Sequence, residues 1–244
     1  MKKELGQKSL SHNRLSDPEL VRVDCHPREC DASLGPCILL AALAFLVYLG
    51  PASVIAYGED HRISSESDHL NNWPNLLGPA ASVSSATGLL MHWDGETGEG
   101  IKWKTRIPLA GYSSPIYWDG KLYLTGANSS TRVVYSIDSE SGEIIWERQV
   151  KSIPGSPSSV RVGEDTGYAA PTMATDGVRV FASFANGDLV ALDFEGRTIW
   201  SKHLGNPENI YGHASSLVTY GDDLLIQYDQ DNLGYVAALD VATG

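Results

Sequence analysis

Two groups of acidic and amide side chains come closest to a metal-binding pattern in this sequence. One runs from Asp138 to Glu143 and the other from Asp229 to Asn232. Both offer clustered oxygen atoms, but neither has the alternating acidic spacing and distal glutamate of a calcium-binding loop. The first group falls on a turn that recurs along the chain. We therefore interpret its side chains as turn formers and predict no metal site.

The cysteines and the catalytic fingerprints give no enzyme signal. Cys25, Cys30 and Cys37 lie near His26, but zinc sites favour paired cysteines at tighter spacing, so we place them in an unstructured tail. The sequence shows no Ser-His-Asp order, no Gly-x-Ser-x-Gly motif, no P-loop and no dinucleotide fingerprint. We therefore predict no catalytic residues.

One aromatic or histidine residue stands near the start of each of three repeated segments. These residues are Tyr112, Tyr168 and His213. If the repeats form a radial β architecture, their first strands line a central channel. The three side chains then form a candidate ligand-contacting surface at the channel mouth, because aromatic rings with a few polar groups are common in binding sites. The alternative is that they only fill space at tapering inner positions.

The elements that would position these side chains recur with a period of roughly 45 to 55 residues. Each copy has an apolar run ending in aspartate, followed by a turn with glycine, and the first two copies then reach a tryptophan. The recurring residues are Asp138, Gly142 and Trp146, then Asp193, Gly196 and Trp200, then Asp240 and Gly244.

Each copy divides into short runs of β-branched and aromatic residues separated by Gly, Asp and Asn, which predicts a meander of strands. The predicted strands are 113–118, 121–125, 132–137 and 143–150, then 169–174, 178–183, 188–193 and 197–204, then 213–216, 223–228 and 234–240. We predict an all-β fold class. The expected architecture is a partial β-propeller of four-stranded antiparallel blades, with about three blades present, preceded by one hydrophobic helix.

A tryptophan recurs once per blade on the outer strand, at Trp103, Trp146 and Trp200. An indole there can cover the seam between neighbouring blades and donate its N–H to a backbone carbonyl. We predict this structural role for all three. Trp103 belongs to residues 100–106, which we predict to be an isolated outer strand.

The charge of the chain excludes some partners. The formal net charge is −12, with six Lys/Arg against six Asp/Glu in residues 1–57 and twelve against twenty-four in residues 58–244. An acidic surface repels phosphate backbones and anionic headgroups. We therefore predict no nucleic-acid binding and no electrostatic membrane docking by the repeats.

The N-terminal region predicts export. Residues 1–33 have no apolar period and are expected to form a flexible tail. Residues 34–57 contain the most apolar run, which has the length of a secretory signal core if it ends at Gly50-Pro51, or of a single membrane anchor if it continues to Tyr57. We predict a linker over 58–72 and the incomplete propeller over 73–244. Both alternatives predict a periplasmic or cell-envelope location, with membrane contact only through 38–57.

The repeats resemble the pyrroloquinoline-quinone-type repeat propellers, whose blade signature is close to Ala-Leu-Asp-x-x-Thr-Gly-x-x-x-Trp. The matching segments are 135–146, 190–200 and 238–244, and the resemblance covers Trp103 to Gly244. It implies a ring of roughly seven or eight blades, of which this chain would be an N-terminal fragment.

The resemblance points to two functions. The outer-membrane protein assembly factor B implies an exported, non-catalytic scaffold that contacts a protein partner or an extracytoplasmic small ligand and needs no cofactor. The quinoprotein dehydrogenases imply quinone (PQQ) and calcium, held beneath a vicinal disulfide. No cysteine follows Cys37, so we expect PQQ and calcium only if further blades supply the missing residues. A third alternative is the ectodomain of a membrane-anchored sensor.

Overall fold

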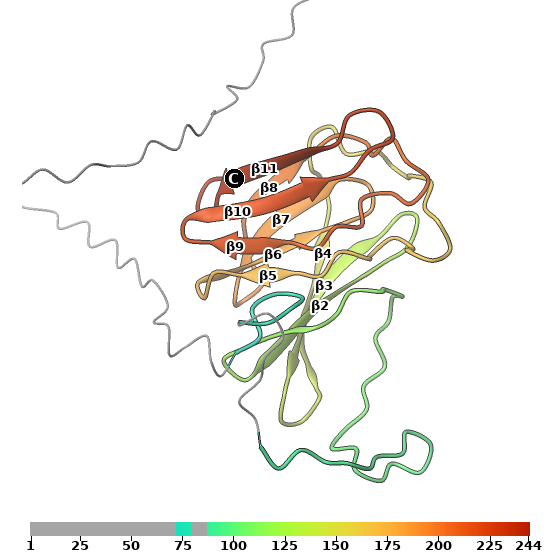
Figure 1. The fold of residues 1–244 in the computed structure, drawn as a ribbon, viewed down its shortest axis with the longest axis vertical. Coiled ribbons are helices and arrows are strands. Elements are labelled where there is room, and N and C mark those ends of the chain that lie inside the picture. Colours follow the sequence, from blue (N-terminus) through green and yellow to red (C-terminus); the bar gives the residue numbers. More distant parts are fainter. Residues whose placement is uncertain (1–71, 80–86) are drawn as a thin grey trace, which may run out of the picture. The chain divides into compact units, whose positions relative to one another are not determined.

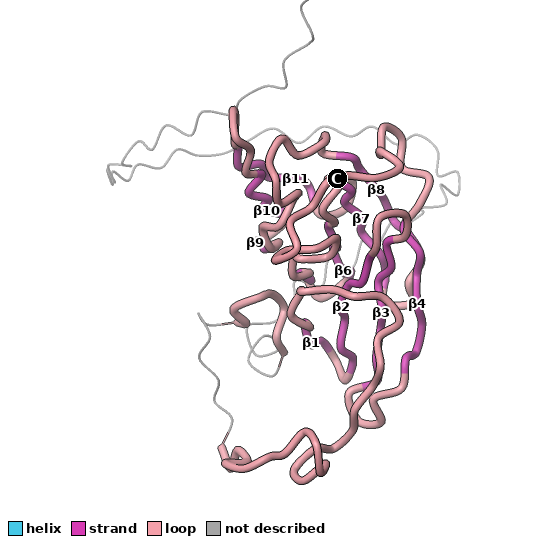
Figure 2. The backbone as a smooth tube through the Cα atoms, turned by 90° about the vertical axis from the view of Figure 1, so that its right-hand side faces the viewer, coloured by secondary structure: helices cyan, strands magenta, loops and turns pink. Residues whose placement is uncertain are grey.

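The computed structural model describes residues 72–79 and 87–244. Within them, eleven strands form three antiparallel sheets (Figures 1 and 2). This confirms the all-β prediction. The same residues include no helix that is long and apolar enough to cross a membrane. The predicted tail, apolar helix and linker lie outside the described residues, except for Asn72.

The three sheets correspond to the three sequence repeats. Blade 1 contains β1 (Ile116–Trp118), β2 (Lys121–Ala127), β3 (Arg132–Asp138) and β4 (Ile144–Val150) in that spatial order. Blade 2 contains β5 (Ala174–Thr175), β6 (Arg179–Ser183), β7 (Asp188–Asp193) and β8 (Thr198–His203). Blade 3 contains β9 (Val218–Tyr220), β10 (Asp223–Tyr228) and β11 (Tyr235–Asp240).

The first hairpin shows why the turns were predictable. Trp118 pairs with Lys121, so only Asp119 and Gly120 connect β1 to β2. Both residues have positive φ, 46° and 75°. This is the backbone of a two-residue hairpin turn with the right twist, and Asp-Gly is among the few pairs that adopt it at low cost.

The first strand of each blade is shorter than the sequence predicts. β1 starts at Ile116, and β5 has only two residues. The residues before them also hydrogen-bond to the next blade. The Ser114 N–H donates to Thr172 Oγ1 at 3.0 Å, and the Thr172 N–H donates to Ser216 Oγ at 3.1 Å. Hydroxyl side chains thus link the inner segments of the three blades in sequence.

Residues 100–106 are not a strand, which corrects the prediction of an isolated outer strand. No described segment lies alongside to complete a ladder. The segment is held through side chains instead: Trp103 Nε1 donates to the Ser139 carbonyl at 2.9 Å, Thr105 Oγ1 donates to the Gly142 carbonyl, and Lys102 pairs with Glu140. The tryptophan therefore docks as predicted without a sheet of its own.

The hydrophobic core lies between blades. One cluster joins blades 1 and 2, and includes Tyr123, Val134, Val180 and Leu192. A second cluster joins blades 2 and 3. Its members include Phe181, Leu189, Leu224, Ile226 and Tyr228. Each sheet thus buries apolar side chains against its neighbour, which is how stacked repeats are stabilised.

A tryptophan side chain reaches across both seams. Trp146 Nε1 donates to the Phe194 carbonyl at 3.0 Å, and Trp200 Nε1 donates to the Val241 carbonyl at 2.9 Å. A register shift precedes each tryptophan: Ile145 and Ile199 are extra residues on β4 and β8. Such bulges change the direction of a side chain, and here they come immediately before the indole that reaches the next blade.

Candidate ligand pocket at the loop face

Two kinds of connection leave each blade at the same end, because successive strands run in opposite directions. We call this end the loop face. It consists of the β2–β3 turn (128–131), the β6–β7 turn (184–187), the β10–β11 turn (229–234), the long connections 151–173 and 204–217, and the segment 110–115 that leads into β1. The short β1–β2 and β3–β4 turns lie at the opposite end.

The connection 151–173 is long for a loop without strands, and loops of this length in compact domains are usually functional. It is tied to both of its neighbours. Thr166 Oγ1 donates to the Tyr211 carbonyl of the next connection at 2.9 Å, and Tyr112 Oη donates to the Glu164 carbonyl at 3.3 Å. The loop face is therefore a surface with defined positions.

The structure brings the three predicted binding residues to this face but gives them different exposures. The Tyr112 N–H donates to the carbonyl of Ala169, which follows Tyr168. The Ala185 N–H donates to the Tyr168 carbonyl, and the His213 N–H donates to the Ala185 carbonyl. Tyr112 is 63% exposed, Tyr168 is half-buried and His213 is only 2% exposed. A ligand-binding role for the three residues stays a prediction.

His213 is packed inside the blade 2–blade 3 seam. Its ring stacks on Tyr228 with centroids 4.9 Å apart, and Tyr228 stacks on Tyr235 at 5.2 Å. Its Nε2 atom is buried and has no hydrogen-bond partner among the residues that the structure describes. Burial lowers the pKa of His213 to about 4, although Asp229 nearby acts in the opposite direction. At neutral pH the ring is uncharged.

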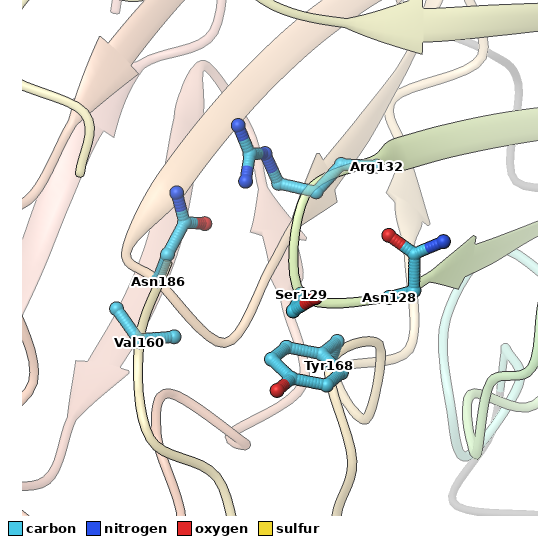
Figure 3. A pocket seen from close by; sticks show the side chains of 6 residues that line it. All are labelled: Asn128, Ser129, Arg132, Val160, Tyr168 and Asn186. Carbon is cyan, nitrogen blue, oxygen red and sulfur yellow. The ribbon is translucent and has the colours of Figure 1, made fainter. Parts of the chain in front are cut away.

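A shallow pocket opens at the loop face between blades 1 and 2, with a cavity volume of about 10 Å³ and a side that is open to solvent. Its lining comes from four segments: Asn128, Ser129, Arg132, Val160, Tyr168 and Asn186. Figure 3 shows Arg132, Asn186, Val160 and Tyr168 arranged around this space, with Ser129 beside the tyrosine ring. Tyr168 is thus the one predicted binding residue that lines the pocket.

A buried network of charged and polar side chains, centred on Asp188, contacts two of the residues that line the pocket. Asp188 is fully buried, and its Oδ2 atom lies 3.2 Å from Arg132 Nε and accepts a hydrogen bond from Ser156 Oγ at 2.7 Å. Its Oδ1 atom lies 3.0 Å from His203 Nδ1. The Asn186 amide donates to Ser156 Oγ at 3.1 Å and accepts from the Asp188 N–H. A buried carboxylate needs such partners.

The sequence does not predict this network. Arg132, Asp188 and His203 fall within predicted strands, and Asn186 falls between two of them. One feature of the sequence does, however, indicate such a network. Asp188 begins a strand that continues Leu-Val-Ala-Leu, and an ionised residue in a buried strand requires a partner. That the partners would be Arg132 and His203 depends on blade packing, which no local pattern specifies.

The predicted structural aspartates form turns, as expected. Asp138 Oδ1 accepts hydrogen bonds from the N–H groups of Glu140 and Ser141, at 2.9 and 2.7 Å. Asp240 bonds Ala242 and Thr243 in the same way. The hydrogen bond from Ser141 lowers the pKa of Asp138, and the Thr243 hydroxyl does so for Asp240. Within the described residues there is no group of three or more His, Cys, Asp or Glu placed to hold a metal ion.

The comparison with family models identifies the repeats. Residues 76–244 match the model described as outer membrane protein assembly factor BamB. The chain belongs to this family. The BamB family match extends the repeat region that the sequence signature indicated, and it confirms the resemblance to the pyrroloquinoline-quinone-type repeat propellers. The chain matches no curated protein.

Solved structures similar to this BamB-family chain include a BamB protein and alcohol and methanol dehydrogenases. BamB from Moraxella catarrhalis is 23% identical, with a TM-score of 0.40 over 58% of this chain and 39% of that one. A europium-containing methanol dehydrogenase is 18% identical, with a TM-score of 0.40 over 53% and 23%. Quinohemoprotein alcohol dehydrogenase from Comamonas testosteroni is 21% identical, with a TM-score of 0.40 over 56% and 20%. The chain therefore spans well under half the length of these proteins.

Proposed function

We propose that this chain is part of an exported, non-catalytic propeller that presents its loop face to a protein partner or extracytoplasmic ligand in the cell envelope. The observation that carries this proposal is the pair of exposed tyrosines, Tyr112 and Tyr211, held at fixed positions on that face. Tyrosine is enriched at binding hot spots because it gives a large contact area with few rotatable bonds.

Both tyrosines are anchored by their backbone. The Tyr112 N–H donates to the Ala169 carbonyl at 2.8 Å. The Tyr211 N–H donates to Asn209 Oδ1 at 2.8 Å, and the Tyr211 carbonyl accepts from Thr166. Their rings remain 63% and 49% exposed. An aromatic side chain on a backbone that is already ordered loses little entropy when a partner binds.

Membership of the BamB family favours a role in outer membrane protein assembly. We expect the scaffold to act in the periplasm or cell envelope, either free or anchored through residues 38–57. A scaffold role needs no cofactor, and the acidic repeats disfavour nucleic acid as a partner.

A photocrosslinking experiment in intact cells tests the scaffold role. The full chain carries p-benzoylphenylalanine in place of Tyr112 or, as a control, in place of Val178. Val178 is 45% exposed and lies in the β5–β6 turn at the opposite end of blade 2. We expect one defined crosslinked partner from position 112 and none from position 178. Equal crosslinking at both positions, or none at either, would contradict a role for the loop face.

The competing hypothesis is that the chain is part of a quinone-dependent dehydrogenase domain. Its fold alone does not distinguish such a domain from a scaffold. Reconstitution with PQQ and calcium decides between them. If the dehydrogenase hypothesis is correct, the protein will oxidise an alcohol or a sugar with a dye as electron acceptor. The sensor hypothesis requires residues 38–57 to stay attached, which mass spectrometry of the mature N-terminus checks.

A further inference from the structure

The pocket between blades 1 and 2 has the chemistry of an anion site. We propose that it binds a carboxylate group through the two terminal nitrogens of Arg132. The proposal rests on the proposed function, because the pocket opens on the loop face, and it adds the chemical class of the group recognised there.

The guanidinium of Arg132 pairs with Asp188 by charge, but its N–H donors are not used by the described residues. Its side chain is 13% exposed, and Nε lies 3.2 Å from Asp188 Oδ2 but is buried and makes no hydrogen bond with the described residues. Among the described residues, no hydrogen bond engages its Nη1 and Nη2 atoms. An arginine held in this way keeps a planar pair of N–H donors available, which matches the two oxygens of a carboxylate.

Asp188 does not depend on Arg132 alone. The carboxylate also accepts the Ser156 hydroxyl at 2.7 Å and contacts His203 Nδ1 at 3.0 Å. Because both of its oxygens already have other polar partners, the guanidinium can pair with a second anion while Asp188 stays solvated by the protein. A fork between a buried anchor and an incoming carboxylate is a common use of arginine.

The remaining walls suit the carbon atoms that carry a carboxylate. Val160 and the ring of Tyr168 are apolar surfaces beside Arg132, and Ser129 adds a hydroxyl (Figure 3). Asn186 is 3% exposed and is fixed by its hydrogen bonds to Ser156 and Asp188, so it defines the shape of the pocket. These groups would contact the carbon atoms next to a carboxylate that lies at the open mouth of the pocket, in a short aliphatic acid or an acidic side chain.

Electrostatics favour a carboxylate over a phosphate. Arg132 is the only cationic residue among those that line the pocket, and the chain carries a net charge of −12. The surrounding negative potential disfavours a dianion more than a monoanion. A single carboxylate is the anion that one arginine can hold under these conditions.

Side-chain NMR on the isotopically labelled full chain tests the site. Acetate is titrated while the Arg132 guanidinium and Asn186 amide signals are followed, and acetamide, a neutral molecule of the same shape, is the control ligand. We expect saturable shifts with acetate and none with acetamide. Equal shifts with both, or no saturable shift with either, would overturn the proposal whether or not any variant folds.

A matched pair of variants assigns the binding to Arg132. Arg132→Lys keeps the positive charge near Asp188 but loses the planar fork, and we expect about tenfold weaker acetate binding. Arg179→Lys is the control: Arg179 is also 13% exposed and lies 3.1 Å from an aspartate, Asp176, but it lies outside the pocket. Equal weakening by both substitutions would overturn the assignment.

Two capped peptides separate the sources of the carboxylate. The probes are acetyl-Ala-Glu-Ala-amide and its Gln counterpart. If the Glu peptide binds at least as tightly as acetate and the Gln peptide does not bind, the site accepts an acidic segment of a partner protein. If acetate alone binds, the ligand is a free small carboxylate. Either result supports the site itself. Crosslinking at position 112 is read independently, so failure of the carboxylate site and failure of the scaffold role can be told apart.

Discussion

The indole of Trp146 in blade 1 lies against the backbone of Gly196 in blade 2. A Cβ atom built on Gly196 would come within 3.0 Å of the ring, and Gly196 has a φ of +78°. Trp103 meets Gly142 in the same way, and Trp200 meets Gly244. The glycine after each blade's aspartate is therefore both a turn residue and the surface on which the preceding tryptophan rests.

This contact predicts that Gly196→Ala destabilises the protein through two effects. A side chain at positive φ costs about 1–2 kcal/mol, and the overlap with Trp146 adds about 1–3 kcal/mol. Gly120→Ala is the control, because Gly120 has a similar φ of +75° but nothing within 4 Å of the added atom. Chemical denaturation of both variants measures the difference. Equal losses of stability would mean that the tryptophan contact contributes nothing.

The segment around Trp103 is predicted to depend on that one side chain. It has no strand pairing, so Trp103→Ala removes an anchor and loosens the backbone around Lys102, Lys104 and Arg106, whose side chains are already exposed, so that trypsin can bind it. We expect about tenfold faster cleavage there, because proteolysis follows local opening. Trp93→Ala is the control, since Trp93 is 68% exposed. Mass spectrometry of the early fragments reports the site, and unchanged cleavage in the Trp103 variant would contradict the anchoring role.

Asp188 gives a third prediction. Asp188→Asn leaves Arg132 without its buried counter-charge, and we expect a loss of about 3 kcal/mol in the free energy of unfolding. Asp176→Asn breaks the more exposed Arg179 pair, where the aspartate side chain is 10% rather than 0% exposed, so a loss of about 1 kcal/mol is expected. Denaturation at neutral pH compares the two. Similar losses would show that burial of Asp188 adds nothing to the pair.

The repeat pattern predicts the blades because each blade is a local meander. Its turn residues and its short runs of strand-forming residues follow one another in the sequence. The tryptophan contacts were predictable for the same reason: the indole recurs at one position of a known repeat. Two features were missed. Residues 100–106 have strand-like composition, but a strand needs a neighbour to pair with. The Arg132–Asp188–His203 cluster joins two blades and the connection between them, so it follows from packing and not from any local pattern.

The burial of His213 predicts acid sensitivity. Its pKa is about 4 in the folded protein and 6.5 without burial, so the unfolded chain binds a proton first as the pH falls. Stability is unaffected by this group above pH 6.5, decreases between about 6.5 and 4, and at pH 5 is lower by about 2 kcal/mol. His213→Phe keeps a ring against Tyr228 but removes the titration. Urea denaturation from pH 7.5 to 5 should show a shallower loss in the variant, because the contribution of His213 is removed while groups with lowered pKa values, such as Asp138 and Asp240, still contribute. Parallel pH profiles for the two proteins would show that His213 is not the buried neutral group that its packing against Tyr228 indicates.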